Sequence, residues 1–471
     1  MDNRKDNILK YAVAVLFAMG LALTAYVTKV IFTYAGAGMA ACFAVVAILI
    51  LIGIFFLQKK SRTASIVLAV ISVVILALVS ASGHKADNML KKVEAKEEMM
   101  TVQIVVLKGS SLTAESDLSG CHLSYVNSEN GAYKRAEEIL KENKKTINLS
   151  IPHGSPAASY DSLVNGESQL MLLSETTKEV LDTERPGFRD NIRVLFEKQY
   201  PMGHINLKPV DILKEPFTLY LQGADLSSGD NINSVGRGDA NILLTVNPET
   251  KKVNMQVIPR DTFVNIPSMG GRSKLSYSGV WGGIQSSIES IEETFDIEIN
   301  YYAKINFQGV IDLVDALGGV EVYSMYNFNA GKYHFNEGYN CVDGDAALNF
   351  VRERKSLPEN ELSRGRNQMA MVKAIITKFG QAPDFDTALS ILDTLSDNFV
   401  TNVPKSDYMK AFNLFVKVLP ELKKMEPKSV KGEFRWHDDE VRTEQYKYYF
   451  YPADGEKERV KREIEAVLEG K

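Results

Sequence analysis

Several residue types are scarce in this chain of 471 residues, which has three cysteines and six histidines. No CxxC or Cys/His spacing indicates a zinc site, and neither HExxH nor a Ser-His-Asp pattern supports a metalloprotease or a serine hydrolase. Cys42 lies in an apolar run, while Cys121 and Cys341 are far apart in the sequence. We therefore expect three free cysteines that act as small apolar side chains, with a Cys121–Cys341 disulfide as the alternative.

Excess positive charge and a nucleotide-binding loop are also missing. The formal net charge is −5, whereas a DNA-binding domain needs a basic stripe. No GxxxxGK(S/T) loop is present, and residues 270–274 (GGRSK) resemble one only superficially. The sequence therefore gives no support to nucleic-acid binding or to a nucleotide-binding fold.

Three long apolar runs lie near the N-terminus, at residues 8–28, 34–57 and 64–81. A membrane-spanning helix needs about 20 apolar residues, which the three runs reach or nearly reach. A cleaved signal peptide would have one short apolar core, so three runs favour a retained anchor. The sequence predicts three transmembrane helices in a membrane anchor formed by residues 1–83.

The basic residues around these runs are unevenly distributed. Six lie at the N-terminus or around the loop between the second and third runs, and only Lys29 lies between the first and second. Because basic loops stay in the cytoplasm, we expect the N-terminus inside and residues 84–471 outside. An external domain has no supply of ATP, so any group transfer there needs an already activated donor. The six residues are Arg4, Lys5, Lys10, Lys59, Lys60 and Arg62.

The exported part divides into two predicted domains. A helical stalk followed by a small α/β unit is expected over residues 84–205, and a proline-rich run marks its end. Residues 206–471 mix strands and helices, which predicts α/β/α layers around a central mixed sheet. Strands are expected at 101–107, 169–173, 191–196, 217–222, 242–246, 253–258, 299–305, 320–323 and 446–451, and helices at 132–145, 283–295, 307–317, 343–354, 361–378, 386–419 and from 457.

Charged residues gather at the ends of the predicted strands and helices of the larger domain. They occur in GAD (223–225), RGD (237–239), PRD (259–261), VRER (351–354) and RGRNQ (364–368). Charges borne on loops beside rigid strands are the usual way in which a site is built. We therefore expect the functional site at these element ends.

The order, spacing and flanks of these motifs resemble the catalytic domain of the LytR-CpsA-Psr family. The resemblance covers residues 217–380, and a three-span anchor followed by an accessory domain is similar to the capsule-associated CpsA branch. One departure is Asn367, where many members carry an arginine; Arg366 stands one position earlier. The resemblance is carried by LYLQGAD, SVGRGDANILLTVNPETKKVNMQVIPRDTFVNIP, KLSYSGVWGG, INYYAKINFQGVIDLVDALGGVEV and GYNCVDGDAALNFVRERKSLPENELSRGRNQ.

The resemblance implies roles for the charged residues. Asp225 and Asp239 match the family's magnesium-linked aspartates, so Mg²⁺ is the expected metal, with Mn²⁺ as the alternative. The expected catalytic residues are Asp239, Arg260, Arg352 and Arg354. The expected phosphate-binding residues are Arg237, Arg260, Lys274, Arg352, Arg354, Arg364 and Gln368.

The chemistry of these side chains agrees with that implication. Transfer of a phosphoryl group depends mainly on positioning and on stabilising the charge spread over its oxygens. Arginine binds phosphate with a planar fork, and Mg²⁺ is held by one or two carboxylates together with phosphate oxygens. Arg364 and Gln368 are four residues apart on a predicted helix, so they share a face. Without the resemblance, each Asp–Arg pair would be a surface ion pair of little energetic value.

A polyprenyl tail would need an apolar channel. Two predicted helices have apolar faces, one of five residues and one formed by Ile284, Ile288 and Ile291. Such faces usually cover a sheet; the alternative is that these helices stand slightly off the sheet and leave a channel whose mouth lies at the arginines. The expected lipid-binding residues are Phe307, Val310, Ile311, Val314 and Leu317.

The resemblance implies a magnesium-dependent phosphotransferase in the cell membrane of a Gram-positive bacterium. It would move a glycan phosphate from an undecaprenyl-pyrophosphate carrier to a peptidoglycan hydroxyl, the 6-hydroxyl of N-acetylmuramic acid, with pyrophosphatase activity on the side. Expected partners are this donor, the acceptor, membrane lipid and other capsule or wall assembly proteins, but not nucleic acid. The alternative is a non-catalytic regulator that binds polyprenyl phosphates. Transcriptional regulation would require an inverted orientation, and cell adhesion would rest on one weak tripeptide.

Overall fold

The computed structural model describes the chain as two compact units. Unit 1 comprises Met1–Glu94, Phe379–Asp397 and Asn402–Lys417, and unit 2 comprises Ala95–Lys378, Asn398–Thr401 and Val418–Lys471. The predicted domain limits at residues 83 and 205 stay predictions. The described residues are 2–57, 60, 62–94, 96–127, 130–226, 230–381, 385–438, 440 and 447–471.

The N-terminal part of unit 1 is helical and apolar. It consists of α1 (Asp2–Leu57) and α2 (Arg62–Val93). By length and composition, Ala14–Phe32 and Ala40–Leu57 can each cross a membrane, whereas Ser65–Ala81 in α2 is a shorter apolar helix. The prediction of three spans is therefore corrected to two of sufficient length among the described residues. The third run is short because polar residues bound it on both sides.

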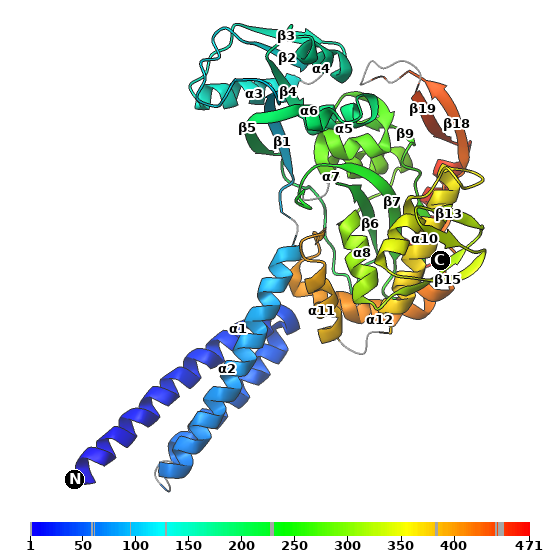
Figure 1. Cartoon of the computed structure of the whole chain (residues 1–471). Coiled ribbons are helices and arrows are strands. Elements are labelled where there is room, and N and C mark those ends of the chain that lie inside the picture. Colours follow the sequence, from blue (N-terminus) through cyan, green and yellow to red (C-terminus); the bar gives the residue numbers. More distant parts are fainter. Residues whose placement is uncertain are drawn as a thin grey trace. The chain divides into compact units, whose positions relative to one another are not determined.

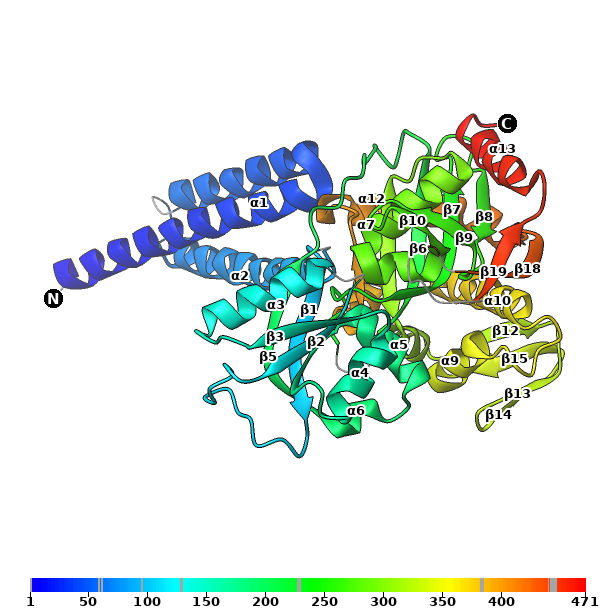
Figure 2. The same cartoon turned by 90° about the horizontal axis from the view of Figure 1, so that it is seen from above.

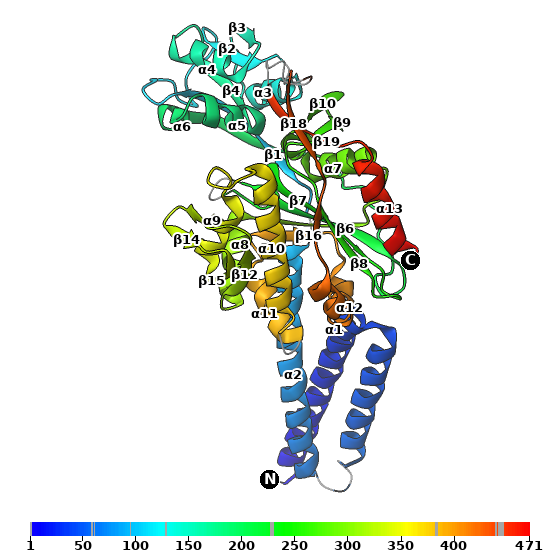
Figure 3. The ribbon, with the colours of Figure 1, turned by 90° about the vertical axis from the view of Figure 1, so that its right-hand side faces the viewer.

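The chain reverses its direction within α1. A Cβ atom on Gly20 would come within 2.9 Å of a Leu51 methyl carbon. In a straight helix these two residues would be about 46 Å apart, since each residue rises by about 1.5 Å. The two apolar stretches therefore pack side by side, as the blue ribbon in Figure 3 shows.

The predicted helix over 386–419 is wrong as a single element. It is divided into α11 (Phe385–Thr394), the strand β16 (Phe399–Thr401) and α12 (Tyr408–Lys424). β16 pairs with the edge of the sheet in unit 2. A β-branched pair flanked by an aromatic residue suits an edge strand, and this tertiary pairing overrides the helical pattern.

The first part of unit 2 is a five-stranded sheet in the order β3-β2-β4-β1-β5. Side chains alternate across the sheet, so Ile104 packs with Ala136 of α3, and Val105 packs with Phe188 of α6. Figure 2 shows the helices around this sheet. The elements are β1 (Met99–Leu107), β2 (His122–Val126), α3 (Asn130–Glu142), β3 (Leu149–His153), α4 (Pro156–Val164), β4 (Leu170–Ser174), α5 (Glu175–Glu184), α6 (Phe188–Asn191) and β5 (Ile192–Pro201).

The second part of unit 2 is built on a six-stranded sheet in the order β16-β11-β6-β7-β8-β17. The pairs β11–β6 and β8–β17 are parallel and the others are antiparallel, so the predicted mixed sheet is confirmed. Its remaining strands are β6 (Phe217–Asp225), β7 (Arg237–Val246), β8 (Val253–Val257), β11 (Tyr301–Asn306) and β17 (Lys428–Ser429).

Helices cover both faces of this sheet. Tyr220 and Leu243 pack with α7 (Leu275–Phe295) and α13 (Glu456–Leu468), while the adjacent Ile242 packs with α10 (Glu361–Phe379) on the opposite face. Figure 3 shows this order of layers, with α10 on one side and α7 and α13 on the other. The predicted α/β/α arrangement follows from the alternation of side chains along each strand.

Shorter elements complete unit 2 (Figure 1). The further elements are β9 (Phe263–Ile266), β10 (Gly271–Lys274), α8 (Phe307–Ala316), β12 (Val320–Ser324), β13 (Phe328–Ala330), β14 (Tyr333–Phe335), β15 (Gly338–Val342), α9 (Gly344–Arg352), β18 (Gly432–His437) and β19 (Lys447–Pro452).

All three cysteines are free, as expected, with Cys121 buried and Cys42 and Cys341 exposed.

Candidate active site

Asp225 and Arg237 meet at one end of the neighbouring strands β6 and β7, in the middle of the six-stranded sheet. β6 ends at Asp225 and its antiparallel neighbour β7 begins at Arg237, and the two residues are directly opposite each other. Their side chains form an ion pair of 2.5 Å and are about three-quarters buried. The predicted metal aspartate and the predicted phosphate arginine are therefore partners in this structure.

Asp239 lies in a β-bulge. The register passes from Gly223 opposite Ala240 to Ala224 opposite Gly238, so Asp239 has no residue opposite it. A bulge of this kind changes the direction in which a side chain points, and bulges are frequent beside active sites. Gly238 fits here because a Cβ atom would lie 2.9 Å from the side chains of its neighbours. The bulge thus gives Asp239 an orientation that a regular strand would not.

A chain of alternating charges begins at Asp239. Arg260 Nη1 lies 2.5 Å from Asp239 Oδ1, and Arg260 Nε lies 3.6 Å from Asp261 Oδ1. Lys274 Nζ lies 3.0 Å from the same Asp261 oxygen. All four side chains are at least 85% buried. Buried charges require such partners, because an unpaired charge away from water is strongly unfavourable.

Helix α10 supplies the opposite wall of this cluster. Arg364 and Glu361 form a buried ion pair of 2.5 Å one turn apart. Gln368, one turn further, donates its side-chain N–H to the backbone carbonyl of Asp239 at 3.4 Å. Arg364 and Gln368 therefore share a helix face, as their spacing predicts, and that face points toward Asp239.

The cluster shifts the pKa of its acids in opposite directions. Burial opposes ionisation of Asp239, but the guanidiniums of Arg260 and Arg364 outweigh it and hold the pKa of this carboxyl below its usual range. Asp261 behaves in the same way: burial opposes ionisation, yet Arg260 and Lys274 lower its pKa. Burial raises the pKa of Glu361 in spite of Arg364. The site therefore keeps two carboxylates ionised in a place with little water.

Two polar atoms of α10 have no hydrogen-bond partner in the described part of the chain. They are Arg364 Nε and Glu361 Oε2, and both are buried. Nearly all buried polar atoms in native proteins are hydrogen-bonded, so exceptions call for an explanation. A ligand or ordered water that reaches the cluster would satisfy them.

Arg352 and Arg354 have different surroundings from the arginines of this cluster. Arg352 is the last residue of α9, Arg354 lies two residues beyond it, and both are exposed. The guanidinium of Arg352 lies over the ring of Phe307, 4.2 Å from its centre. Neither arginine forms an ion pair with another described residue, so both guanidiniums remain available for an anion.

The two apolar helix faces that the sequence suggested as a channel differ in how deeply they are buried. Ile284, Ile288 and Ile291 are fully buried in the core of the central sheet, so that face is ordinary core and the channel hypothesis is wrong for it. Among the five predicted lipid-binding residues, only Val314 is fully buried. The other four predicted lipid-binding residues, Phe307, Val310, Ile311 and Leu317, are partly exposed.

The two carboxylates of the site, Asp225 and Asp239, can hold a divalent cation whose other ligands come from a bound substrate. Each pairs with an arginine in the structure: Asp225 through Oδ2 and Asp239 through Oδ1. No group of three or more acidic, histidine or cysteine side chains fit to hold a metal is found among the described residues. The donor set therefore fits Mg²⁺ only if phosphate oxygens complete its coordination, which is its common mode in proteins.

Two members of the cluster were not among the predicted site residues. Asp261 belongs to the PRD motif, whose position after a strand was a usable signal. Glu361 had only a local signal, the spacing of three residues from Arg364 on a predicted helix. Its contribution depends on burial, which the spacing does not reveal.

Comparison with known proteins gives consistent similarities. The model of the LytR_cpsA_psr family matches residues 195–465. The polyisoprenyl-teichoic acid–peptidoglycan teichoic acid transferase TagU of Bacillus licheniformis is 33% identical over 193 residues, which are 41% of this chain and 62% of that protein. TagU of Oceanobacillus iheyensis is 36% identical over 197 residues, or 40% of this chain and 60% of that protein. This chain thus spans about three-fifths of the length of these relatives.

Two solved structures resemble the chain, both with TM-scores below 0.5. The crystal structure of Bacillus subtilis TagU covers 54% of this chain and 97% of its own, with a TM-score of 0.42 and 24% identity. A structure of TagT bound to LI-WTA covers 56% of this chain and 95% of its own, with a TM-score of 0.44 and 28% identity.

Proposed function

Because the chain belongs to the LytR-CpsA-Psr family, we propose that it is a phosphotransferase that moves a glycan phosphate from a polyprenyl-pyrophosphate carrier to a hydroxyl of peptidoglycan. The observation that carries the proposal is the buried Asp239–Arg260 pair with Arg364 beside it, near the beginning of β7. Relatives named as transferases between polyisoprenyl-linked teichoic acid and peptidoglycan support this substrate class.

The proposed reaction is one displacement at phosphorus. The oxygen of the acceptor hydroxyl forms a bond to the phosphorus that carries the glycan, and the bond from that phosphorus to the bridging oxygen breaks. The products are a glycan–peptidoglycan phosphodiester and a polyprenyl phosphate, and the hydroxyl proton passes to a base. With water as the acceptor, the same step is pyrophosphate hydrolysis.

We assign Asp239 as the group that receives the proton or orients the hydroxyl. Its pKa lies below the usual range because Arg260 and Arg364 outweigh the effect of burial, so it is ionised at neutral pH. A carboxylate of low pKa is a weak base, which favours orientation of the hydroxyl over full proton removal. Arg260 and Arg364 provide fixed positive charge where negative charge develops on the phosphoryl oxygens.

Arg352 and Arg354 are assigned to the diphosphate of the incoming donor. They are exposed and have no ion pair in the described part of the chain, so binding does not first require a carboxylate to leave. Arg352 also lies over Phe307, the first residue of α8. We propose that the polyprenyl tail follows the partly exposed apolar side chains of α8 from this point.

Mg²⁺ is proposed as the cofactor, with Asp225 and Asp239 as its protein ligands. A bound Mg²⁺ would neutralise charge on the phosphoryl oxygens. Arg237 and Arg260 hold these carboxylates in place through ion pairs, which fixes their positions before a substrate arrives.

A location outside the membrane is part of the proposal. The apolar stretches Ala14–Phe32 and Ala40–Leu57 suit a membrane anchor. We propose that unit 2 lies outside the membrane, where both the lipid-linked donor and the wall are present.

The proposal is tested with the full-length protein in detergent, a defined polyprenyl-pyrophosphate-linked glycan and a soluble peptidoglycan fragment. We expect release of polyprenyl phosphate together with a phosphodiester product. A protein that binds polyprenyl phosphate without cleaving the donor under any metal condition would instead be the non-catalytic regulator.

A further inference from the structure

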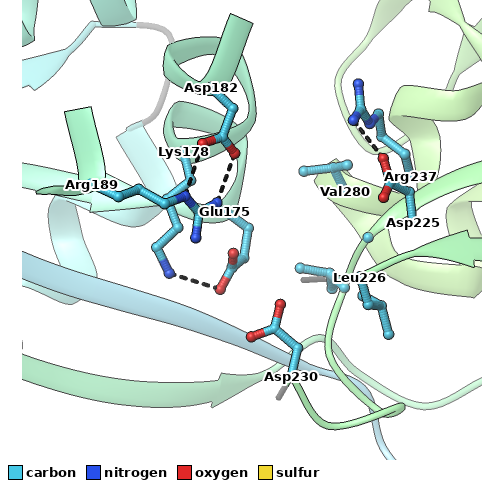
Figure 4. Close-up of a pocket in the computed structure, with 11 residues that line it drawn as sticks. Glu175, Lys178, Asp182, Arg189, Asp225, Leu226, Asp230, Arg237 and Val280 are labelled. Carbon is cyan, nitrogen blue, oxygen red and sulfur yellow. Dashed lines mark hydrogen bonds and ion pairs between the residues drawn. The ribbon is translucent and has the colours of Figure 1, made fainter. Parts of the chain in front are cut away.

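A small polar pocket lies beside Asp225, at the same end of strands β6 and β7 as the site described above. Its volume is about 90 Å³. One wall comes from the second part of unit 2, with Asp225, Asp230 and Arg237. The other wall comes from α5 and α6 of the first part, with Glu175, Lys178, Asp182 and Arg189 (Figure 4). Figure 4 shows these two groups facing each other across the pocket.

Backbone hydrogen bonds tie the two walls together near this pocket. Met99 N–H, at the start of β1, donates to Asn233 O at 2.8 Å, and Val235 N–H donates to Met99 O at 3.2 Å. Next to this contact, Glu98 forms a buried ion pair with Lys304 of β11. The loop that carries Val235 into β7 is therefore held against β1, so the pocket has a fixed second wall.

The charges of the pocket identify the kind of ligand that it fits. Its lining contains four acidic and three basic side chains, and each base has a carboxylate partner. The pairs are Lys178–Glu175 at 3.2 Å, Arg189–Asp182 at 2.7 Å and Arg237–Asp225 at 2.5 Å. A phosphate would therefore meet more negative than positive charge and no uncommitted cation.

A sugar hydroxyl suits this lining better than an anion. A hydroxyl donates one hydrogen bond and accepts others, so it can bridge a carboxylate and a neighbouring guanidinium or ammonium group without separating the ion pair. The pocket is also far larger than the roughly 10–15 Å³ that one water needs, yet too small for a chain of sugars. It matches the hydroxyl-bearing end of one sugar unit.

We propose that this pocket, called here the α5–β7 pocket, receives the hydroxyl-bearing sugar of the acceptor, and that α5 and α6 form its specificity-determining wall. The proposal rests on the proposed function, because Asp225 connects the pocket to the phosphoryl site. It assigns a role to residues 99–201, for which the sequence offered none.

Arg189→Ala is the decisive variant and Arg185→Ala is its matched control. The side chains of Arg189 and Arg185 are 46% and 38% exposed, and each forms a two-pronged ion pair, with Asp182 and Asp161 respectively. Arg185, however, does not line the α5–β7 pocket. Exposed ion pairs contribute little to stability, so both variants should fold with similar melting temperatures.

We expect Arg189→Ala to raise the KM for a soluble peptidoglycan fragment about tenfold, as loss of one charge-assisted hydrogen bond predicts. The kcat should be recovered at saturating fragment, and Arg185→Ala should stay within about twofold of the wild type. An unchanged KM for the fragment would overturn the proposal. A rise confined to the KM for the lipid-linked donor, or to the Mg²⁺ concentration for half-maximal rate, would also overturn it.

A second measurement separates this proposal from the proposed function. Binding of the fragment is followed by NMR titration of the full-length protein without donor. Weaker binding by Arg189→Ala but not by Arg185→Ala supports the pocket even when no donor is turned over. Equal binding by all three proteins rejects it, even when the wild type is an active transferase.

Discussion

The predicted phosphate-binding arginines occupy two contrasting regions of unit 2. Arg260 and Arg364 are buried and have carboxylate partners at 2.5 Å, whereas Arg352 and Arg354 are exposed and have no ion pair in the described part of the chain. Buried pairs hold each other in fixed positions, and breaking them is costly. Exposed, unpaired arginines are available to bind an anion. We propose that the exposed arginines bind the donor and that the buried arginines provide a fixed electrostatic field.

The largest effect should come from breaking the buried pair. Asp239→Asn keeps the shape of the side chain but removes its charge, leaving Arg260 without its nearest carboxylate. We expect a loss of turnover of about 10³-fold, typical of losing a group that handles the reacting proton. The free energy of unfolding should fall by about 3 kcal/mol, because a buried charge loses its partner. Donor cleavage and chemical denaturation measure the two effects.

The matched control for that variant is Asp161→Asn. Asp161 also forms an ion pair of 2.5 Å, with Arg185, but its side chain is 44% exposed. Its loss should change stability by less than about 1 kcal/mol, since exposed pairs are solvated and screened. Equal destabilisation by the two variants would contradict the distinction between buried and exposed charge.

Removal of divalent metal should have the next largest effect. If Asp225 and Asp239 hold Mg²⁺ against the phosphate, excess chelator should reduce turnover about 10²- to 10³-fold, and added Mg²⁺ should restore it. The ion pairs with Arg237 and Arg260 persist without metal, so the melting temperature should change little. Full activity in excess chelator would remove the metal from the mechanism.

Variants of the exposed arginines should affect turnover and spare the fold. Arg352→Ala should lower kcat/KM for the donor about 10²-fold, and Arg352→Lys should recover only part of it because the ammonium lacks a planar fork. Lys355→Ala, at an exposed cation three residues further along, is the control. If Arg352→Ala and Arg354→Ala both keep wild-type rates, these residues merely end the helix.

The smallest predicted effect is a pH dependence of stability. Arg260 and Arg364 outweigh burial and hold the pKa of Asp239 below its unfolded value of about 3.9. Its ionised form therefore stabilises the fold above that pH, and this contribution disappears as the pH falls through the lower, folded pKa. The difference in unfolding free energy between the wild type and Asp239→Asn should be constant above about pH 5 and should shrink below about pH 4. A constant difference down to pH 3 would show that the charge of Asp239 does not stabilise the fold.

The parts of the fold with a clear local pattern could be predicted from the sequence. The β-strand-forming residues at 217–222 and 242–246 predicted most of β6 and the second half of β7, and the spacing of Arg364 and Gln368 predicted a shared face of α10. Charged residues at the ends of predicted elements were expected to lie together, and the structure brings Asp239, Arg260 and Arg364 together. Each of these features depends on neighbours in the sequence.

Features that depend on tertiary pairing could not be predicted in this way. The strand β16 interrupts an otherwise helical pattern because the edge of the central sheet pairs with it. The bulge at Asp239 depends on the register between β6 and β7, which no single strand determines. For the same reason Ile288 and Val310 both fit an apolar helix face, and only the packed structure shows that the first is core and the second is partly exposed.

The unpaired position of Asp239 has a consequence for redesign of this protein. The pairs on one side of the bulge, such as Gly223 with Ala240, and those on the other, such as Asp225 with Arg237, differ in register by a single residue. Deleting that one residue would restore an unbroken ladder along the whole length of β6 and β7. A redesign that maximises regular hydrogen bonding would therefore produce a regular sheet without Asp239. In this sequence the bulge that presents Asp239 is retained at the expense of a regular ladder.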